Sequence, residues 1–198
     1  MARTHGSIDV LTVYAISVEN LERPEVETRW LLRLVAEVLR SDRKALIENG
    51  VRLRFIGELE MLPPELQRVL QTAESHGPAE DSERLLMCIA LSYSGRHEVA
   101  RVAKALAERV SAGELRAEEL DEAAFSDALR SSPRCAPSDP DFLIRTGGQQ
   151  RLSNFLLYQA AYTELYVTDT LWPDFGAEQL CDALQRFAGR RRTFGRRL

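Results

Sequence analysis

Two arginines and a serine stand close to a pair of glycines in one short segment of the chain. Arg145 precedes the pair Gly147 and Gly148, and Arg151 and Ser153 follow it. Guanidinium groups form forked hydrogen bonds with phosphate oxygens, and a serine hydroxyl adds a further donor. This combination predicts a site for a phosphate or a diphosphate. An ordinary strand-to-helix turn with two surface arginines is the alternative that the local chemistry leaves open.

The residues around this turn predict a strand before it and a helix after it. Asp141 to Ile144 is an apolar run led by an acid and indicates a buried strand. Ser153 stands at the N-cap position of an apolar-periodic segment, which indicates a helix. Unpaired N–H groups at a helix N-terminus attract anions, so the expected phosphate site lies between the strand and the helix. The spacing matches neither the Gly-Lys-Ser loop nor the dinucleotide fingerprint.

A second polar set follows another apolar run. Ile8 to Ser17 is nearly continuous in apolar and β-branched residues, which is typical of a central parallel strand covered on both faces. Ser17, Glu19 and Asn20 come at its carboxyl end, where ligands bind in open α/β sheets. One interpretation is a loop that contacts substrate, and the other is an ordinary turn capped by Asn20.

Glu164 stands between an expected helix and an expected strand in apolar surroundings. A buried carboxylate without a partner is costly, so we expect a cation beside it. A metal ion and the guanidinium of a neighbouring arginine are both possible partners. His97 opens an expected helix with no second histidine or cysteine nearby, so we interpret it as a cap or surface residue and assign it no metal.

Strands and helices are expected to alternate along the chain. The expected strands are 8–17, 51–57, 84–92, 141–144 and 165–169, and the expected helices are 24–48, 66–73, 99–110, 118–129 and 177–188. This alternation predicts an α/β protein whose open, mostly parallel sheet is flanked by helices. At 198 residues and 44% hydrophobic, the chain fits a single domain spanning 1–198.

Composition excludes several classes of protein. A net charge of −4 argues against a nucleic-acid binder. The sequence has no run of about 20 apolar residues and no secretory leader, so we expect no transmembrane segment and a cytoplasmic location. The widely spaced Cys88, Cys135 and Cys181 predict reduced thiols rather than a disulfide framework. Arg190 to Arg197 forms one basic cluster, for which a solvated tail is the simplest interpretation.

The run IRTGGQQRLSNFLLYQAAYTELYVTDTLWPDF resembles the C-terminal signature of the cis-prenyltransferase, or undecaprenyl diphosphate synthase, family. LTVYAISVENLERP, NGVRLRFIG and LSYSGRHE resemble further family segments in the same order, so the resemblance covers nearly the whole chain. It implies condensation of isopentenyl diphosphate with an allylic diphosphate, such as farnesyl diphosphate, to a Z-configured polyprenyl diphosphate. It also implies a hydrophobic tunnel walled in part by the helix 24–48, in which the bulky Trp30 is expected to shorten the tunnel.

The resemblance further implies a role for each matching residue. Asn20 is the implied catalytic residue, helping to remove a proton from the isopentenyl donor, and Glu164 is the implied ligand of Mg²⁺. The implied substrate-binding residues are Ser17, Glu19, Arg23, Arg145, Arg151 and Ser153. A homodimer is implied as well. In the family, a C-terminal tail reaches the partner's active site, and Arg192 to Gly195 loosely resembles that tail.

Several positions depart from the family pattern. The family usually carries Phe and Trp at Ile16 and Leu21, and an acid and a His at Gln149 and Gln150. The family's opening strand, its Met-Asp-Gly-Asn-x-Arg-Trp turn and its first helix have no counterpart, and Ala2 to Gly6 resembles the last turn of that helix. We therefore expect the first strand and first helix of the family fold to be absent.

Three interpretations of this beginning stay open. In the first, the gene start is assigned too far downstream, or the chain has been cut. In the second, the chain is a donor-binding or non-catalytic subunit of a heteromeric prenyltransferase, paired with a complete homologue. In the third, it is an inactive diphosphate-binding module.

Overall fold

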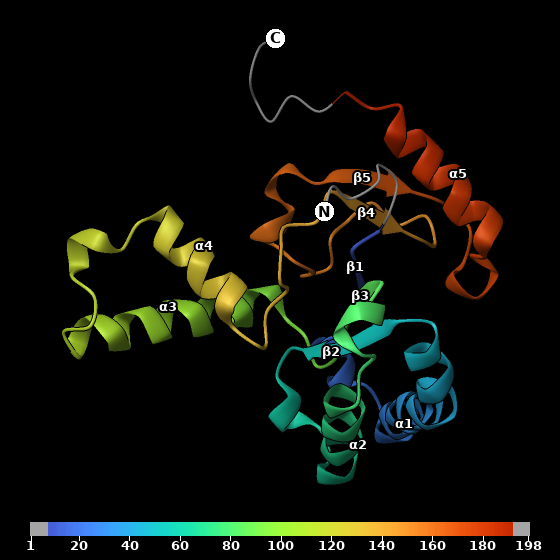
Figure 1. Ribbon diagram of the computed structural model, residues 1–198, viewed down its shortest axis with the longest axis horizontal. Helices are drawn as coiled ribbons and strands as arrows, with labels where there is room; N and C mark the ends of the chain where they lie inside the picture. The colour runs from blue at the N-terminus through green and yellow to red at the C-terminus, as the bar shows by residue number, and fades with distance from the viewer. Residues whose placement is uncertain (1–7, 192–198) are drawn as a thin grey trace. The chain divides into compact units, whose positions relative to one another are not determined.

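Residues 8–191 are described by the computed structural model shown in Figure 1. The helical turn expected at Ala2 to Gly6 and the tail from Arg192 to Gly195 lie outside these residues. The chain divides into two compact units, Met1–Pro137 and Ser138–Leu198. Each unit contains its own parallel sheet. The single domain expected from the sequence stays a prediction.

The first unit is built on three parallel strands, β1 (Val10–Tyr14), β2 (Val51–Ile56) and β3 (Leu85–Ala90). Their order is β1-β3-β2, with Val10 opposite Leu86 and Val51 opposite Leu85. The expectation that the first strand is central was wrong, because β3 inserts between the two earlier strands. Leu11 on β1 is accordingly 42% exposed.

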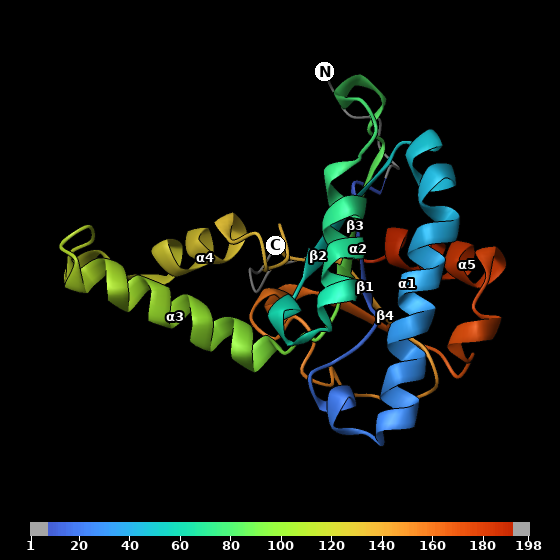
Figure 2. The ribbon, with the colours of Figure 1, turned by 90° about the horizontal axis from the view of Figure 1, so that it is seen from below.

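Two helices connect these strands, α1 (Glu25–Glu48) after β1 and α2 (Pro64–Ser75) after β2. Figure 2 shows them running in the same direction beside the sheet, as crossovers between parallel strands must. Their apolar faces join the sheet in one hydrophobic core. Its buried members include Ile16, Leu39, Leu53, Phe55, Leu66, Leu70, Ala73 and Leu91.

The chain leaves α1 through Asn49 and Gly50. Gly50 has a φ of 78°, and a Cβ atom there would lie 2.4 Å from the Ser82 carbonyl oxygen. Only glycine fits this position, which turns the chain directly into β2.

A pair of helices, α3 (Gly95–Ser111) and α4 (Glu122–Ser131), completes the first unit. Each begins with a side-chain cap: Ser94 accepts a hydrogen bond from the His97 backbone N–H, and Asp121 accepts one from that of Ala124. His97 therefore lies in the first turn of a helix, where its side chain is exposed. This agrees with its interpretation as a surface residue.

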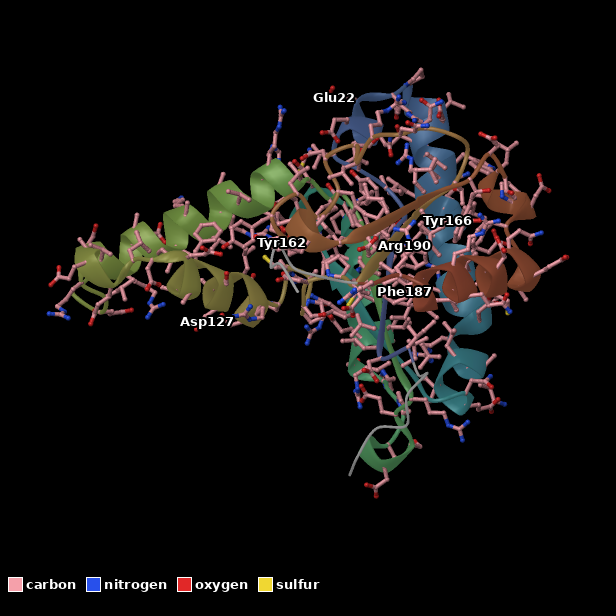
Figure 3. All side chains as sticks on the ribbon, turned by 90° about the horizontal axis from the view of Figure 1, so that it is seen from above. Glu22, Asp127, Tyr162, Tyr166, Phe187 and Arg190 are labelled. Atoms are coloured by element: carbon pink, nitrogen blue, oxygen red, sulfur yellow. The ribbon has the colours of Figure 1, made fainter. Side chains whose placement is uncertain are left out.

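The second unit contains a pair of parallel strands, β4 (Phe142–Arg145) and β5 (Glu164–Val167), followed by α5 (Ala177–Ala188). Phe142 stacks on Phe187 of α5 with 4.8 Å between ring centroids. The Tyr166 hydroxyl donates to Asp182 Oδ2 at 3.1 Å. These contacts hold α5 against the strand pair. Tyr166 and Phe187 are labelled in Figure 3.

The helix expected after Ser153 is wrong. The chain from residue 151 to 158 forms turns, and only a short 3₁₀ helix, Gln159–Tyr162, follows. Ser153, Asn154 and Leu156 have φ values of 50°, 63° and 44°. These left-handed conformations cannot continue a right-handed helix, so the apolar spacing of this segment misled the prediction.

The α/β class, the parallel strands and the flanking helices expected from the sequence are confirmed. The hydrophobic tunnel stays a prediction, and Trp30 is 61% exposed on α1. Within residues 8–191, every helix is too short or too polar to serve as a membrane span.

Candidate functional site

Ser17 and Asn20 close a turn directly after β1. The Ser17 N–H donates to Asn20 Oδ1 at 3.0 Å, and the Asn20 N–H donates to Ser17 Oγ at 3.1 Å. Ser17 is 8% exposed, whereas Asn20 is half-buried. Among the described residues, the Asn20 Nδ2 group donates no hydrogen bond, so both of its N–H donors are available to a ligand.

Backbone hydrogen bonds join this turn to Tyr93, which follows β3. Ser17 forms a parallel bridge with Tyr93, the Val18 N–H donates to the Tyr93 carbonyl at 3.1 Å, and the Tyr93 N–H donates to the Ile16 carbonyl at 3.1 Å. The Tyr93 hydroxyl donates to Glu98 Oε2 at 2.7 Å, and Glu98 is 1% exposed. This buried tyrosine and glutamate connect the turn to the first turn of α3.

Glu98 was not predicted from the sequence as a site residue. An acid at the fourth position of α3, in the middle of the apolar face that packs inward, is the signal that could have revealed it. A carboxylate buried to this extent needs a hydrogen-bond donor. Tyr93 supplies one, five residues earlier in the chain.

Glu19 and Arg23 belong to the same loop but lie at its surface. Glu19 opens the short 3₁₀ helix Glu19–Glu22, and both side chains are exposed. Arg23 Nη1 donates to Glu27 Oε1 at 2.7 Å, and its N–H donates to the Asn20 carbonyl at 3.3 Å. The structure therefore brings the four predicted residues of the first unit onto one loop, with Ser17 and Asn20 forming its base.

Arg145 is the last residue of β4 in the second unit. Its backbone carbonyl accepts a hydrogen bond from the Thr168 N–H at 2.9 Å, which aligns β4 with the residue that follows β5. Its Nε atom is buried and has no hydrogen-bond acceptor among the described residues. A buried guanidinium N–H without an acceptor is uncommon and costs free energy, which an anionic oxygen would recover.

Gly147 and Gly148 form the tight turn expected from the sequence. Their φ values are 77° and 71°. The Gly147 N–H donates to the Thr170 carbonyl and the Gly148 N–H to the Thr168 carbonyl, each at 2.9 Å. A Cβ atom on Gly148 would lie 2.6 Å from Asp169 Oδ1. The turn is thus held against the loop after β5, and the left-handed φ values favour glycine at both positions.

Arg151 and Ser153 follow this turn without a helix behind them. Arg151 is exposed and donates from Nη1 to Gln149 Oε1 at 2.6 Å, and Ser153 is half-buried. The helix N-terminus expected to add backbone N–H groups here is absent, because the left-handed residues form turns instead. The anion donors of this segment are therefore its side chains.

Glu164, at the start of β5, forms an ion pair with Arg190. Arg190 Nη1 lies 2.5 Å from Glu164 Oε2, and Arg190 Nη2 donates to the Leu165 carbonyl at 3.0 Å (Figure 3). The cation expected beside Glu164 is present, but the carboxylate is 30% exposed rather than buried. Of the two partners that the sequence left open, the structure shows the neighbouring arginine.

No cluster of three or more His, Cys, Asp or Glu side chains that could hold a metal ion occurs among residues 8–191. Glu164 by itself supplies one carboxylate. Mg²⁺ is commonly held by one or two carboxylates together with substrate phosphates and water. The donor set thus fits Mg²⁺ that arrives with a diphosphate, provided that Glu164 exchanges Arg190 for the ion.

The three cysteines are free thiols. Burial raises the pKa of the Cys88 thiol to about 11. Burial also raises the pKa of the Cys135 thiol, which lies 3.6 Å from Arg101 Nη2. Because the thiolate is the reactive form, neither buried cysteine is suited to act as a nucleophile near neutral pH.

Parallel strands with polar loops at their carboxyl ends, together with a glycine turn flanked by arginines, define an α/β protein with a candidate anion site. A family model described as putative undecaprenyl diphosphate synthase matches residues 2–195, and the chain therefore belongs to this cis-prenyltransferase family.

Relatives with curated names support this assignment. An isoprenyl transferase of Prochlorococcus marinus is 43% identical over 188 residues, which cover 95% of this chain and 69% of that protein. A ditrans,polycis-undecaprenyl-diphosphate synthase ((2E,6E)-farnesyl-diphosphate specific) of Xanthomonas axonopodis is 44% identical over 188 residues, which cover 95% of this chain and 71% of that protein. The predicted enzyme class, a prenyltransferase of the cis type, is confirmed.

Solved structures show the same fold. Lavandulyl diphosphate synthase from Lavandula x intermedia, in complex with dimethylallyl diphosphate, superposes with a TM-score of 0.86 at 36% identity, covering 96% of this chain and 80% of that chain. A probable undecaprenyl diphosphate synthase from Campylobacter jejuni superposes with a TM-score of 0.82 at 32% identity, covering 96% and 84%. These comparisons give no support to a donor-binding subunit or an inactive module.

Proposed function

We propose that the chain condenses isopentenyl diphosphate with an allylic diphosphate, such as farnesyl diphosphate, to give a Z-configured polyprenyl diphosphate. Membership of the family supports this reaction, and the name of the Xanthomonas relative specifies farnesyl diphosphate. The structural observation that carries the proposal is the buried Nε of Arg145, which lacks an acceptor among the described residues beside a rigid glycine turn.

The second unit holds the diphosphate of the isopentenyl donor. Arg145 presents a guanidinium whose missing acceptor costs about 1–3 kcal/mol, so a diphosphate oxygen is favoured there over an apolar group. Arg151 exchanges its contact with the neutral amide of Gln149 for a charged oxygen. Ser153 adds a hydroxyl donor.

The loop after β1 carries the residues to which the family resemblance assigns a part in proton removal. The C1–O bond of the allylic diphosphate breaks, and its electrons leave with diphosphate. The π electrons between C3 and C4 of isopentenyl diphosphate form the new bond from C4 to C1. A proton then passes from C2 of the donor to the released diphosphate, and its bonding electrons form the C2–C3 double bond. The Asn20 side chain has no basic group, so it does not accept this proton itself. We assign it a positioning role, in which its available Nδ2 donates a hydrogen bond to the proton acceptor and orients it. Ser17, Glu19 and Arg23 border the donor on the same loop.

Glu164 is the residue that would hold Mg²⁺ with the substrate diphosphate. When bound, the ion would offset the negative charge that grows on the departing diphosphate. Arg190 occupies the carboxylate in the structure, so this role requires the two cations to exchange. We also propose that the chain forms a homodimer, with a heteromer as the alternative, and that it is located in the cytoplasm.

The purified chain, incubated with isopentenyl and farnesyl diphosphates and Mg²⁺, tests the reaction. Mass spectrometry should detect products longer than farnesyl diphosphate by whole isoprene units, and Arg145→Gln should raise the KM for isopentenyl diphosphate by about tenfold or more. Arg116→Gln removes an exposed arginine of the first unit and serves as the charge-matched control. The absence of any extended product, with the chain folded by circular dichroism, would refute the proposal.

A further inference from the structure

A pocket of about 290 Å³ opens between α1 and α2 of the first unit. Arg40 and Arg43 line it from α1, and Arg68 and Thr72 line it from α2. We call it the α1–α2 pocket. None of its residues is among the substrate, catalytic or metal residues predicted from the sequence, so the proposed reaction leaves the pocket without a role.

Within residues 8–191, no carboxylate forms an ion pair with any of the three arginines of the pocket. Arg40 and Arg43 form no ion pair with any described residue, and Arg68 donates from Nε to the Pro64 carbonyl at 3.3 Å. Other cations of α1 do find carboxylates, as Arg29 does with Glu25 and Lys44 with Glu48. Three guanidiniums that converge on one hollow repel one another, and an anion in the hollow would relieve that repulsion.

The floor of the pocket is apolar. Leu39 and Ala73 are 4% and 2% exposed and belong to the hydrophobic core, and Val69 packs against the same core. A protein wall of this kind excludes water from one side of the bound anion and strengthens its attraction to the arginines. It also accepts a few carbon atoms of a ligand. The pocket is thus suited to an anion that carries an apolar portion.

We propose that the α1–α2 pocket binds a phosphate group on an organic ligand with a short apolar portion. Arginine matches phosphate in geometry as well as in charge, because its fork donates two parallel hydrogen bonds. Arg40, Arg43 and Arg68 bind the phosphate oxygens, and Leu39 and Val69 contact the adjoining carbon atoms. The ligand is either the head group of an anionic phospholipid or a soluble phosphate ester.

Binding assays with the whole chain distinguish these two sources. Glycerol 3-phosphate, titrated by calorimetry, probes the soluble ester. Sedimentation with phosphatidylcholine vesicles, with and without phosphatidylglycerol, probes the head group. The variant R40Q/R43Q/R68Q should weaken the binding of whichever probe the wild type binds by about tenfold or more, because each charge-assisted hydrogen bond is strong. Added salt should weaken binding further, since the pocket is open to solvent.

The control variant R109Q/R116Q/R130Q removes the same charge from exposed, ion-paired arginines around α3 and α4. It should bind like the wild type, and so should Arg145→Gln, which leaves the pocket intact while testing the proposed donor site. Equal losses in the pocket and control variants would assign binding to net charge and overturn the proposal. Failure of the folded wild type to bind either probe would overturn it as well.

Discussion

Glu164 and Arg190 form an ion pair that ties the start of β5 to the residue two positions after α5. The side chains are 30% and 36% exposed, so the pair contributes no more than about 1 kcal/mol to stability. The pair matters more for the candidate metal site than for stability. It places a cation on the carboxylate that the proposed function assigns to Mg²⁺, and the arginine therefore competes with the metal ion.

Removing Arg190 should favour Mg²⁺. Because Arg190→Gln leaves Glu164 without its charged partner, the Mg²⁺ concentration for half-maximal prenyl transfer should fall by severalfold, whereas Glu164→Gln should raise it by about tenfold. Arg186→Gln is the matched control, since it breaks an exposed ion pair with Asp182 on α5. Titrations of activity with MgCl₂ measure the effect. Identical Mg²⁺ curves for all four proteins would remove Glu164 from metal binding.

Gly148 should be the least replaceable residue of the turn after β4. A side chain there adopts a left-handed φ of 71° and also meets Asp169 Oδ1 at 2.6 Å. We expect Gly148→Ala to lower the free energy of unfolding by about 1–2 kcal/mol, or more if the loop after β5 cannot move, and to raise the KM for isopentenyl diphosphate. Urea denaturation and steady-state kinetics provide the two measurements.

Gly147→Ala separates the conformational cost of a left-handed φ from the clash with Asp169. Gly147 has a similar φ of 77°, yet its nearest neighbour, Leu171 Cδ2, lies 3.9 Å from the added Cβ. This variant should therefore show the conformational cost without the clash. Equal losses for both variants would show that the approach of Asp169 is unimportant.

The pKa of the Cys88 thiol predicts a loss of stability in alkali. Burial raises this pKa from 9.0 to about 11, so the folded state keeps a proton that the unfolded state gives up. The contribution of Cys88 is fully present below pH 9 and is lost as the pH rises from 9 to 11. We expect this loss to be about 2 kcal/mol. Unfolding by urea at several pH values measures it.

Cys88→Ala should remove that part of the pH dependence. The matched control is Cys181→Ala, because Cys181 is an exposed thiol on α5. Cys135, whose pKa burial also raises, is retained in both variants and cancels in the comparison. Parallel stability curves for Cys88→Ala and the wild type between pH 9 and 11 would contradict the assignment to Cys88.

Local patterns in the sequence predicted the elements well where the apolar periodicity agrees with the residues that begin or end a helix or strand. The predicted helix 177–188 matches the bounds of α5, and the predicted helix 24–48 ends at the last residue of α1. The turn at Gly147 and Gly148 was also predicted, because tight turns select glycine through local backbone geometry.

Features set by distant parts of the chain could not be predicted in the same way. The insertion of β3 between β1 and β2 depends on long-range pairing, so the central strand was misassigned. The partner of Glu164 lies 26 residues away, and no local signal indicated it. The segment after Ser153 has helical spacing of apolar residues, yet it adopts left-handed turns, because tertiary contacts override a weak local preference.

Two substitutions at Asn20 should separate its structural contribution from its proposed catalytic one. Asn20→Asp keeps the Oδ1 acceptor for the Ser17 N–H at 3.0 Å but loses the Nδ2 donor. It should unfold like the wild type, while kcat falls by about a hundredfold, as for the loss of a group that assists proton transfer.

Asn20→Ala loses the acceptor as well. Because Ser17 is only 8% exposed, its N–H then lacks a partner in a poorly hydrated place, and the free energy of unfolding should fall by about 1–2 kcal/mol. Kinetics and urea denaturation of both variants give the comparison. If Asn20→Asp retained wild-type kcat, the side chain would serve only to close the turn after β1, and proton removal would have to be assigned to another residue.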